Sequence, residues 1–165
     1  LRIESIRGNV QTRLSKLDSG EFDAIVLAQA GLSRLAIERY DACPLAVAEC
    51  LPAPGQGALG IEIITDSPVR ALLEKLADSK VSRCVEAERG ISAGLGADCA
   101  LPVAAHGVLE ANGDIHLRAL VAEADGSRII RAEAKGGEPA QLAQELVEQL
   151  LAQGADGILA NARRL

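Results

Sequence analysis

The stretch VAAHGVLEANGDIHLRALVAEADGSRIIRAEA, residues 103–134, decides the fold of the second part of this chain. It divides into three strand-like runs, separated by Ala-Asn-Gly at 111–113 and Ala-Asp-Gly-Ser at 124–127. Such sequences favour β-hairpins, because Asn, Asp and Gly tolerate the backbone conformations of tight turns. The pattern therefore predicts an antiparallel meander of three strands over 103–111, 114–124 and 127–134.

Helical patterns flank this predicted sheet. After it, leucines recur every four residues over 139–152 and predict a helix with one apolar face, with Gly154 beyond its end. Before it, we expect helices over 67–78 and 81–95, the first capped by Asp66 or Ser67 with Pro68 at its first position. Together these elements form an α+β unit with a three-stranded antiparallel sheet and three helices.

The first part of the chain has a different pattern. A short strand over 1–6, a helix over 10–19 that ends at Gly20, a buried parallel strand over 22–28 and a helix over 30–39 are expected. This β-α-β-α order is typical of an α/β layer, whose ligand site lies at the carboxyl ends of the strands. A Pro-rich crossover loop over 41–56 and a short strand over 60–64 follow.

Composition and charge exclude several classes of protein. The chain of 165 residues has a net charge of −6, one Phe, one Tyr and no Trp, so it lacks the basic face and stacking platforms of a nucleic-acid binder. Charged residues interrupt every apolar run before the roughly 18 residues of a membrane span. The four cysteines form no CxxC pair, so no metal site is predicted, and without a signal peptide we expect a cytoplasmic protein with reduced thiols.

Two arginines are candidates for binding carboxylates. Arg7 is expected at a strand-to-helix turn and Arg13 inside the helix that follows, where guanidinium forks and the positive helix end would act together. The alternative is a solvated surface with salt bridges to Glu4 or Asp18. Residues 1–40 hold six basic against five acidic side chains and the remainder 11 against 18, so the basic character lies in the first segment.

Two loops could also carry chemistry. Cys99 stands in a glycine-rich connection between a helix and the first meander strand, where a thiol is accessible, although an inert thiol fits the spacing equally well. Gln56 lies between Gly55 and Gly57, a turn whose backbone could approach a ligand or could simply be tight. The residues alone leave both alternatives open.

The order of these pieces resembles the C-terminal half of the hydroxymethylbilane synthase (porphobilinogen deaminase) family, and the resemblance covers nearly the whole chain. It rests on four segments: IRGNVQTRLSKLDSGEFDAIVLAQAGLSRL at 6–35, LPAPGQGALGIE at 51–62, CVEAERGISAGLGADCALPVAAHG at 84–107 and IHLRALVAEADGSRIIRAEAKG at 115–136.

The resemblance implies a transferase of porphyrin and haem biosynthesis. In that family, four porphobilinogen molecules are condensed into the linear tetrapyrrole hydroxymethylbilane, and ammonia is released. A cysteine at the position of Cys99 holds a dipyrromethane cofactor through a thioether. Asp98 departs from the small residue or glycine that usually precedes this cysteine, a change that affects the shape of the loop but leaves the thiol in place.

The resemblance also implies the residues of the binding site. Arg7, Arg13 and Arg34 match arginines that hold the acetate and propionate groups of cofactor and substrate, and Arg89 matches one directed at the cofactor. Gln56 matches a glutamine at the interdomain cleft. Backbone groups near Ala30 and Gly31 are implied as well.

Family architecture implies three parts. Residues 1–56 would belong to a second domain, part of an α/β domain like those of periplasmic binding proteins. Residues 57–66 would form a strand returning to a first domain, and 67–165 would form the third domain, which bears the cofactor cysteine. The absence of Met and the start at Leu1 indicate a fragment, so a missing N-terminal domain is expected as a partner of this chain, and the full-length protein is expected to be a monomer.

Two other classes of function fit the residues. One is a stand-alone binding module for small anionic ligands, in which the arginines bind carboxylates and Cys99 is a plain thiol. The other is a structural or regulatory α+β domain.

The resemblance predicts that the isolated 165-residue chain forms no tetrapyrrole from porphobilinogen, whatever it binds. The catalytic aspartate of the family precedes the part that this chain matches, so no catalytic residue is expected within it. Assay of tetrapyrrole formation by the purified chain checks this, and measurable turnover would refute it.

Overall fold

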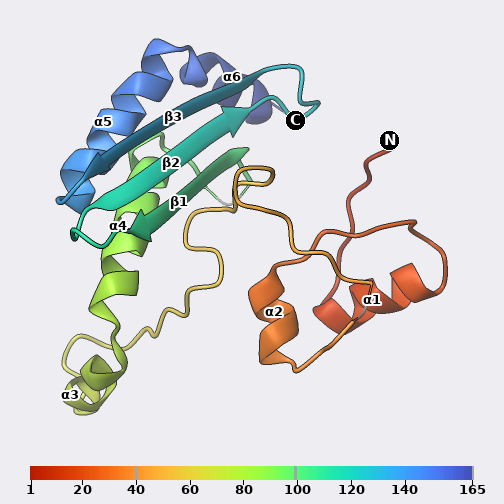
Figure 1. Cartoon of the computed structure of the whole chain (residues 1–165), viewed down its shortest axis with the longest axis horizontal. Helices are drawn as coiled ribbons and strands as arrows, with labels where there is room; N and C mark the ends of the chain where they lie inside the picture. The colour runs from red at the N-terminus through yellow and green to blue at the C-terminus, as the bar shows by residue number, and fades with distance from the viewer. Residues whose placement is uncertain (40, 99, 165) are drawn as a thin grey trace. The chain divides into compact units, whose positions relative to one another are not determined.

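The computed structural model describes residues 1–39, 41–98 and 100–164 and divides the chain into two compact units, Leu1–Pro44 and Leu45–Leu165. The larger unit is a sheet with helices packed against one of its faces (Figure 1). Every buried apolar residue of the described chain belongs to this unit, between Ala87 and Leu159. No described helix combines the length and the apolar character needed to cross a membrane.

The predicted antiparallel meander is confirmed. Its strands are β1 (Val103–Leu109), β2 (Ile115–Ala122) and β3 (Ile129–Gly136), paired in the order β1-β2-β3. Side chains of β2 alternate between buried and half-buried, as expected when helices cover only one face of an antiparallel sheet. The core side of β2 is formed by Ile115, Leu117, Ala119 and Val121.

Three helices cover the core side of the sheet (Figure 1): α4 (Ser79–Gly94), α5 (Pro139–Ala152) and α6 (Ala155–Ala162). The first two confirm the predictions closely, and α5 has the predicted bounds. The leucines of its apolar face are buried, as expected: Leu142, Leu146 and Leu150. The sequence interpretation missed α6, which follows Gly154 directly and buries Ile158 and Leu159.

Glycines allow α4 and α5 to pack closely. An ideal Cβ on Gly90 would lie only 2.5 Å from the Cβ of Ala143. One turn later, a Cβ on Gly94 would lie 2.7 Å from Cγ2 of Val147. Real Cβ atoms do not approach so closely, so the contact between the two helices depends on the missing side chains.

The helix predicted over 67–78 is shorter than expected. The structure has α3 (Arg70–Leu73) followed by the 3-10 turn η1 (Glu74–Leu76), and Val69 is the N-cap in place of Asp66 or Ser67. Leu72 and Leu76 are largely exposed, so no packed apolar face extends the helix.

The smaller unit holds α1 (Val10–Asp18), which begins and ends as predicted. The Asn9 side chain accepts the Thr12 N–H at 2.8 Å. Gly20, at φ +76°, donates to the Leu17 carbonyl, and the next N–H donates to Lys16, which is a Schellman motif.

The second helix of this unit, α2 (Gln29–Arg34), ends five residues earlier than predicted. Ala36 adopts the left-handed conformation, at φ +50°, and its N–H donates to the Ser33 carbonyl, so the same kind of cap closes this helix without a glycine. Beyond it, Arg39 bonds Asp18 and Asp41, both at 2.7 Å, and lowers the pKa of the Asp41 carboxyl.

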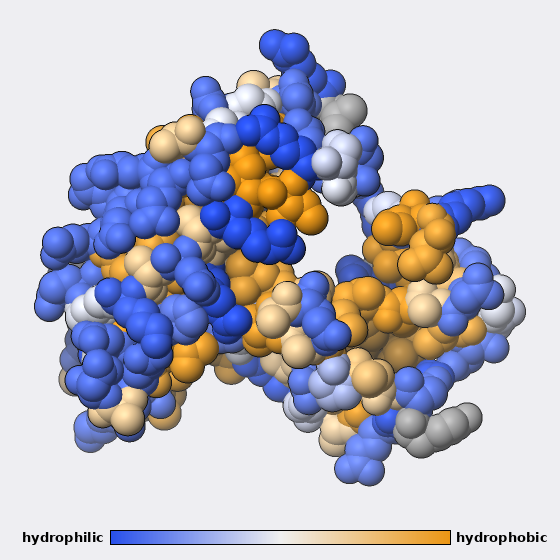
Figure 2. Space-filling view, turned by 45° about the horizontal axis from the view of Figure 1, so that its top comes forward, coloured by the Kyte–Doolittle hydropathy of each residue, from blue (hydrophilic) through white to orange (hydrophobic). Residues whose placement is uncertain are grey.

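The strands predicted over 1–6, 22–28 and 60–64 are wrong for this structure, which has no strand in these segments. A strand exists only with a hydrogen-bonded neighbour, and the described part of 1–44 offers none. Val26 is 70% exposed and Ile61 59%, so these apolar runs are not buried. Figure 2 shows hydrophobic surface, in orange, among hydrophilic surface, in blue.

The fold class is therefore confirmed in part. The chain is mixed α and β, with the predicted three-stranded antiparallel sheet, but the expected α/β layer like that of periplasmic binding proteins has no strand in the described part of 1–56. The division of the chain at 56 and 66 stays a prediction.

We predict that Gly90→Ala lowers the free energy of unfolding by about 1–3 kcal/mol, because the new methyl group overlaps Ala143. The matched control is Gly157→Ala in α6, which has open space around it and should gain up to about 1 kcal/mol from helix propensity. Urea unfolding of the two variants measures the difference. Equal stabilisation by both substitutions would contradict the close contact between α4 and α5.

Candidate functional site

A buried carboxylate joins three segments of the larger unit. Glu88 of α4 is 7% exposed, and its two oxygens accept separate backbone N–H groups: Oε2 accepts from Gly55 at 2.7 Å and Oε1 from Gly107 of β1 at 2.8 Å. Hydrogen bonds to a charged group contribute roughly 1.5–3 kcal/mol each. The side chain thus fixes the 54–57 turn against both the helix and the sheet.

The same region covers the free edge of the sheet. β1 pairs with β2 on one side only, so the N–H groups on its other side need partners. Gly107 donates to Glu88, and Ala105 donates to the Pro52 carbonyl at 3.1 Å. The segment that leads into the Gly-Gln-Gly turn therefore lies along the edge of β1.

This arrangement positions two of the predicted site residues. Gln56 is exposed in the turn, directly after the glycine that Glu88 holds, and its own N–H donates to the Ala53 carbonyl at 3.0 Å. Arg89 follows Glu88 on α4 and is also exposed. Glu88 therefore links the turn that carries Gln56 to the helical turn that carries Arg89.

Two titratable side chains surround the buried carboxylate. Nδ1 of His106 lies 3.6 Å from Oε1 of Glu88 and 3.1 Å from the Gly107 carbonyl oxygen. Burial raises the pKa of the Cys84 thiol, and the negative charge of Glu88 raises it further. Cys84 is therefore a weak nucleophile at neutral pH, because the thiolate is the reactive form.

The smaller unit carries the other described site residues. Arg7 is exposed just before α1, and Arg13, on α1, is half-buried. Nε of Arg13 donates to the Gly8 carbonyl at 2.7 Å, which holds this guanidinium at the beginning of the helix and uses one of its five N–H donors. Glu4 pairs with Arg2 instead, and Asp18 with Arg39, so the alternative salt bridges to Arg7 and Arg13 do not form.

The beginning of α2 lies close to the beginning of α1. A Cβ on Gly31 would lie 3.6 Å from Cγ2 of Val10, and Gly31 and the neighbouring Ala30 are half-buried. Arg34 is exposed in the last turn of α2. The unit thus brings the residues at the start of α1 near the Ala30-Gly31 backbone.

The cysteine that the resemblance singles out, Cys99, lies outside the described residues. The free thiols that the structure describes are Cys43 and Cys50, which are exposed, and Cys84, which is half-buried. In the described part of the chain, no cluster of three His, Cys, Asp or Glu could hold a metal ion.

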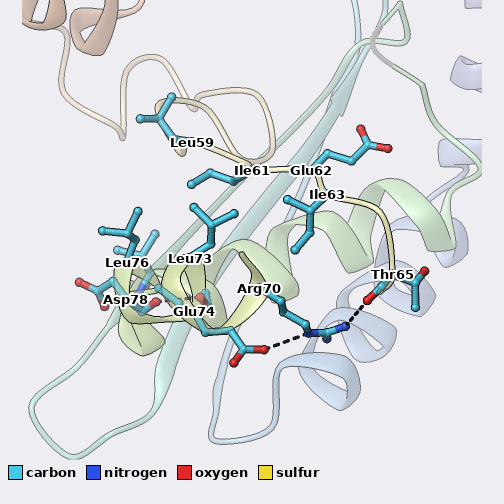
Figure 3. Close-up of a pocket in the computed structure, with 13 residues that line it drawn as sticks. Leu59, Ile61, Glu62, Ile63, Thr65, Arg70, Leu73, Glu74, Leu76 and Asp78 are labelled. Carbon is cyan, nitrogen blue, oxygen red and sulfur yellow. Dashed lines mark hydrogen bonds and ion pairs between the residues drawn. The ribbon is translucent and has the colours of Figure 1, made fainter. Parts of the chain in front are cut away.

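A groove of about 640 Å³ lies between residues 59–65 and the α3 to α4 region (Figure 3). Its walls include the apolar side chains of Leu59, Ile61 and Leu73, and none of the described site residues predicted from the sequence lines it. Its arginine, Arg70, donates to Glu74 at 3.0 Å and to the Thr65 carbonyl at 3.3 Å. This groove is mainly apolar and does not offer a free cationic site.

The role of Glu88 was missed by the sequence interpretation. Residues 84, 88, 91 and 95 repeat at helical spacing, and Ile91 and Leu95 are core residues, so an acid falls on the buried stripe of α4. A buried acid requires hydrogen-bond partners, so an acid on this stripe indicates a buried polar contact at Glu88. Which backbone groups would meet it could not be predicted from spacing.

We predict that Glu88→Gln lowers the free energy of unfolding by about 1–3 kcal/mol, because an amide offers one acceptor oxygen to two buried N–H donors. Glu86→Gln, which removes an exposed charge from the same helix, is the matched control and should change stability by less than about 0.5 kcal/mol.

Hydrogen exchange gives a second measurement of the same interaction. The amides of Gly55 and Gly107 should exchange faster in Glu88→Gln than in Glu86→Gln. Equal exchange in both variants would contradict the role of Glu88 in holding the turn.

Two family models match the chain. Residues 1–71 match "Porphobilinogen deaminase, dipyromethane cofactor binding domain", and residues 82–152 match "Porphobilinogen deaminase, C-terminal domain". The second match begins inside α4, at residue 82, and covers the rest of that helix, the complete sheet and α5. The first contains the basic segment around α1 and α2.

Similar curated proteins carry the same name. Porphobilinogen deaminase of Acidithiobacillus ferrooxidans is 47% identical over 164 residues, which is 99% of this chain and 53% of that protein. The Bordetella parapertussis protein is 48% identical over 165 residues, covering 97% and 52%, and the Thiobacillus denitrificans protein is 46% identical over 162 residues, covering 96% and 53%. The chain spans about half the length of these relatives. By both family models and these identities, the chain belongs to the porphobilinogen deaminase family.

Proposed function

We propose that this chain is the C-terminal half of a porphobilinogen deaminase, which condenses four porphobilinogen molecules into hydroxymethylbilane and releases ammonia. The observation that carries the proposal is the match of residues 1–71 to a cofactor-binding domain model, because this segment contains Arg7, Arg13 and Arg34. The family assignment favours this activity over a stand-alone anion-binding module.

The side chains present fit a group that carries carboxylates. Each pyrrole of the substrate bears an acetate and a propionate, so the growing pyrrole chain accumulates negative charge. Guanidinium groups remain charged at neutral pH and bind carboxylates through paired N–H donors. Arg13 retains four donors after its bond to Gly8, and Arg7, six residues earlier in the sequence, is exposed. We assign both to binding acetate and propionate groups.

The larger unit holds two further residues that we assign to ligand binding. Arg89 and Gln56 are both exposed, and Glu88 links their segments through its bond to Gly55. A guanidinium and an amide on segments fixed in this way can bind a carboxylate without reorganising, which is the advantage of a preorganised site. In the smaller unit, we assign ligand binding also to the backbone at Ala30 and Gly31 and to Arg34.

Cys99 is the proposed attachment point of dipyrromethane. When bound, this group supplies the anchored end from which the pyrrole chain is extended. Of the described thiols, Cys84 is a poorer candidate because it is half-buried and its pKa is raised, and the resemblance assigns no attachment role to Cys43 or Cys50. We propose further that residues 57–66 return to a preceding domain that holds the catalytic aspartate, and that the full-length enzyme is a cytoplasmic monomer.

Mass spectrometry of the full-length protein tests the attachment. Peptide mapping should find a dipyrromethane adduct on the Cys99 peptide of the unaltered protein, whereas the intact mass of Cys99→Ala should lack it. Cys84→Ala is the matched control, because it removes a thiol from the same domain, and it should retain the adduct. Deaminase activity should follow the adduct in all three proteins.

Two outcomes would overturn the proposal. One is an unmodified Cys99 thiol in full-length protein that is active. The other is an adduct on Cys43, Cys50 or Cys84 in the unaltered protein.

A further inference from the structure

The face of the sheet turned away from the helices carries a second groove, of about 410 Å³. Residues 47–51 form one wall, and β2 and β3 form its base around Arg118 and Arg131. Arg118 alternates with the buried Leu117 and Ala119, which places it on the face opposite the core. A volume of this size is within the range of small-molecule sites.

Both arginines of this groove have unused donors. Nε of Arg118 is buried without a hydrogen-bond partner, although the side chain as a whole is only half-buried. Within the described part of the chain, neither the Arg118 nor the Arg131 guanidinium makes a hydrogen bond or an ion pair. The terminal nitrogens of Arg118 are not buried in this way, so they are the donors that a ligand in the groove can reach.

The acids of the groove do not satisfy these donors. Glu133 stands directly opposite Arg118 in the register, but its Oε2 contacts Nε2 of His116 at 3.3 Å. Oε2 of Glu49 accepts the Ala46 N–H at 2.9 Å. Each of these two carboxylates therefore has one oxygen engaged elsewhere, while the two guanidinium groups have no partner among the described residues.

We propose that this groove binds a small organic monocarboxylate, held by the terminal nitrogens of Arg118 and assisted by Arg131. Arg131 pairs with Leu120 in the register and so lies diagonal to Arg118, within reach of the same ligand. A planar carboxylate presents two oxygens at the spacing of two N–H groups of a guanidinium.

The composition of the walls selects the class of anion. Val47, Leu51 and Leu120 contribute apolar surface, which favours a ligand with a hydrocarbon body. Two arginines and two glutamates give the groove no formal net charge, so a single negative charge is easier to accommodate than the higher charge of phosphate. This site goes beyond the proposed deaminase activity, because it uses none of the residues assigned to that activity.

Titration of the ¹⁵N-labelled 165-residue chain with butyrate, followed by amide chemical shifts, tests the proposal. Butyrate should give saturable shifts at 118–120 and 131–133, with a dissociation constant in the millimolar range. Butyramide, which is neutral and of similar shape, should give none. Inorganic phosphate at the same ionic strength should bind at least tenfold more weakly.

Variants distinguish a built site from general charge attraction. Arg118→Lys keeps the charge but removes the planar fork of N–H donors, and Arg131→Gln removes an exposed charge; each should weaken butyrate binding at least tenfold. Arg164→Gln is the matched control, with the same loss of charge at an exposed position remote in sequence, and should bind as the unaltered chain does.

The proposal is overturned if butyrate gives no saturable shifts in these segments, or if butyramide or phosphate binds as tightly. Unchanged affinity in both Arg118→Lys and Arg131→Gln overturns it as well. Dispersed amide spectra of the variants establish that they are folded. If Arg118→Lys unfolds, Arg131→Gln still tests the proposal, because Arg131 is exposed and its substitution should leave the fold intact. None of these measurements requires deaminase activity, so failure here and failure of the proposed function are distinguishable.

Discussion

The bond network of the Glu88 carboxylate is the interaction on which the larger unit depends. A buried carboxylate is costly unless its oxygens are hydrogen-bonded, and here the two oxygens bind two different segments. The partners are Gly55 in the turn and Gly107 at the free edge of β1. One side chain therefore covers part of an exposed sheet edge and fixes the segment that runs beside it.

The placement of Glu88 depends in turn on how α4 packs. Gly90 allows α4 to lie against Ala143 of α5, while Gly107 of β1 leaves room for Cys84, whose Cα and Cβ would lie 3.4 Å from a Cβ there. Because α4 is fixed on both sides by backbone contacts, the Glu88 carboxylate has little freedom to move toward solvent. Core packing and the hydrogen bonds of Glu88 are therefore coupled, and substitutions in the two should have non-additive effects on the free energy of unfolding.

The parts of the fold that could be predicted are those specified by local sequence. Turn sequences at 111–113 and 124–127 define the meander. The leucine spacing that defines α5 lies entirely within residues 139–152, so no other segment is needed to predict this helix. The apolar run over 22–28 is a different case, because strand formation requires a pairing partner that its own sequence does not contain. Its apolar character was recognised, but a similar run can remain extended and exposed, as Val26 does.

The candidate site residues likewise divide into those that the sequence indicates and those that only the folded chain shows. Arginines with carboxylate chemistry could be singled out from residue type and resemblance, and the structure adds that Glu4 and Asp18 are engaged elsewhere. Arg118 could not be predicted as a site residue, because an arginine in an alternating strand is usually solvated. Its buried Nε and its place in a groove with residues 47–51 are known only from the folded chain. Whether a buried donor has a hydrogen-bond partner depends on the tertiary structure, so it cannot be predicted from a pattern in one sequence.

The use of a carboxylate in place of a fourth strand has a consequence for the turn. A strand would hold the edge of β1 through a ladder of bonds, whereas Glu88 holds Gly55 through one. The helix that supplies this charged hydrogen bond also carries Arg89. The turn with Gln56 is held in addition by the Ala105 N–H, which donates to the Pro52 carbonyl, so both the helix and the edge of the sheet contribute to its position.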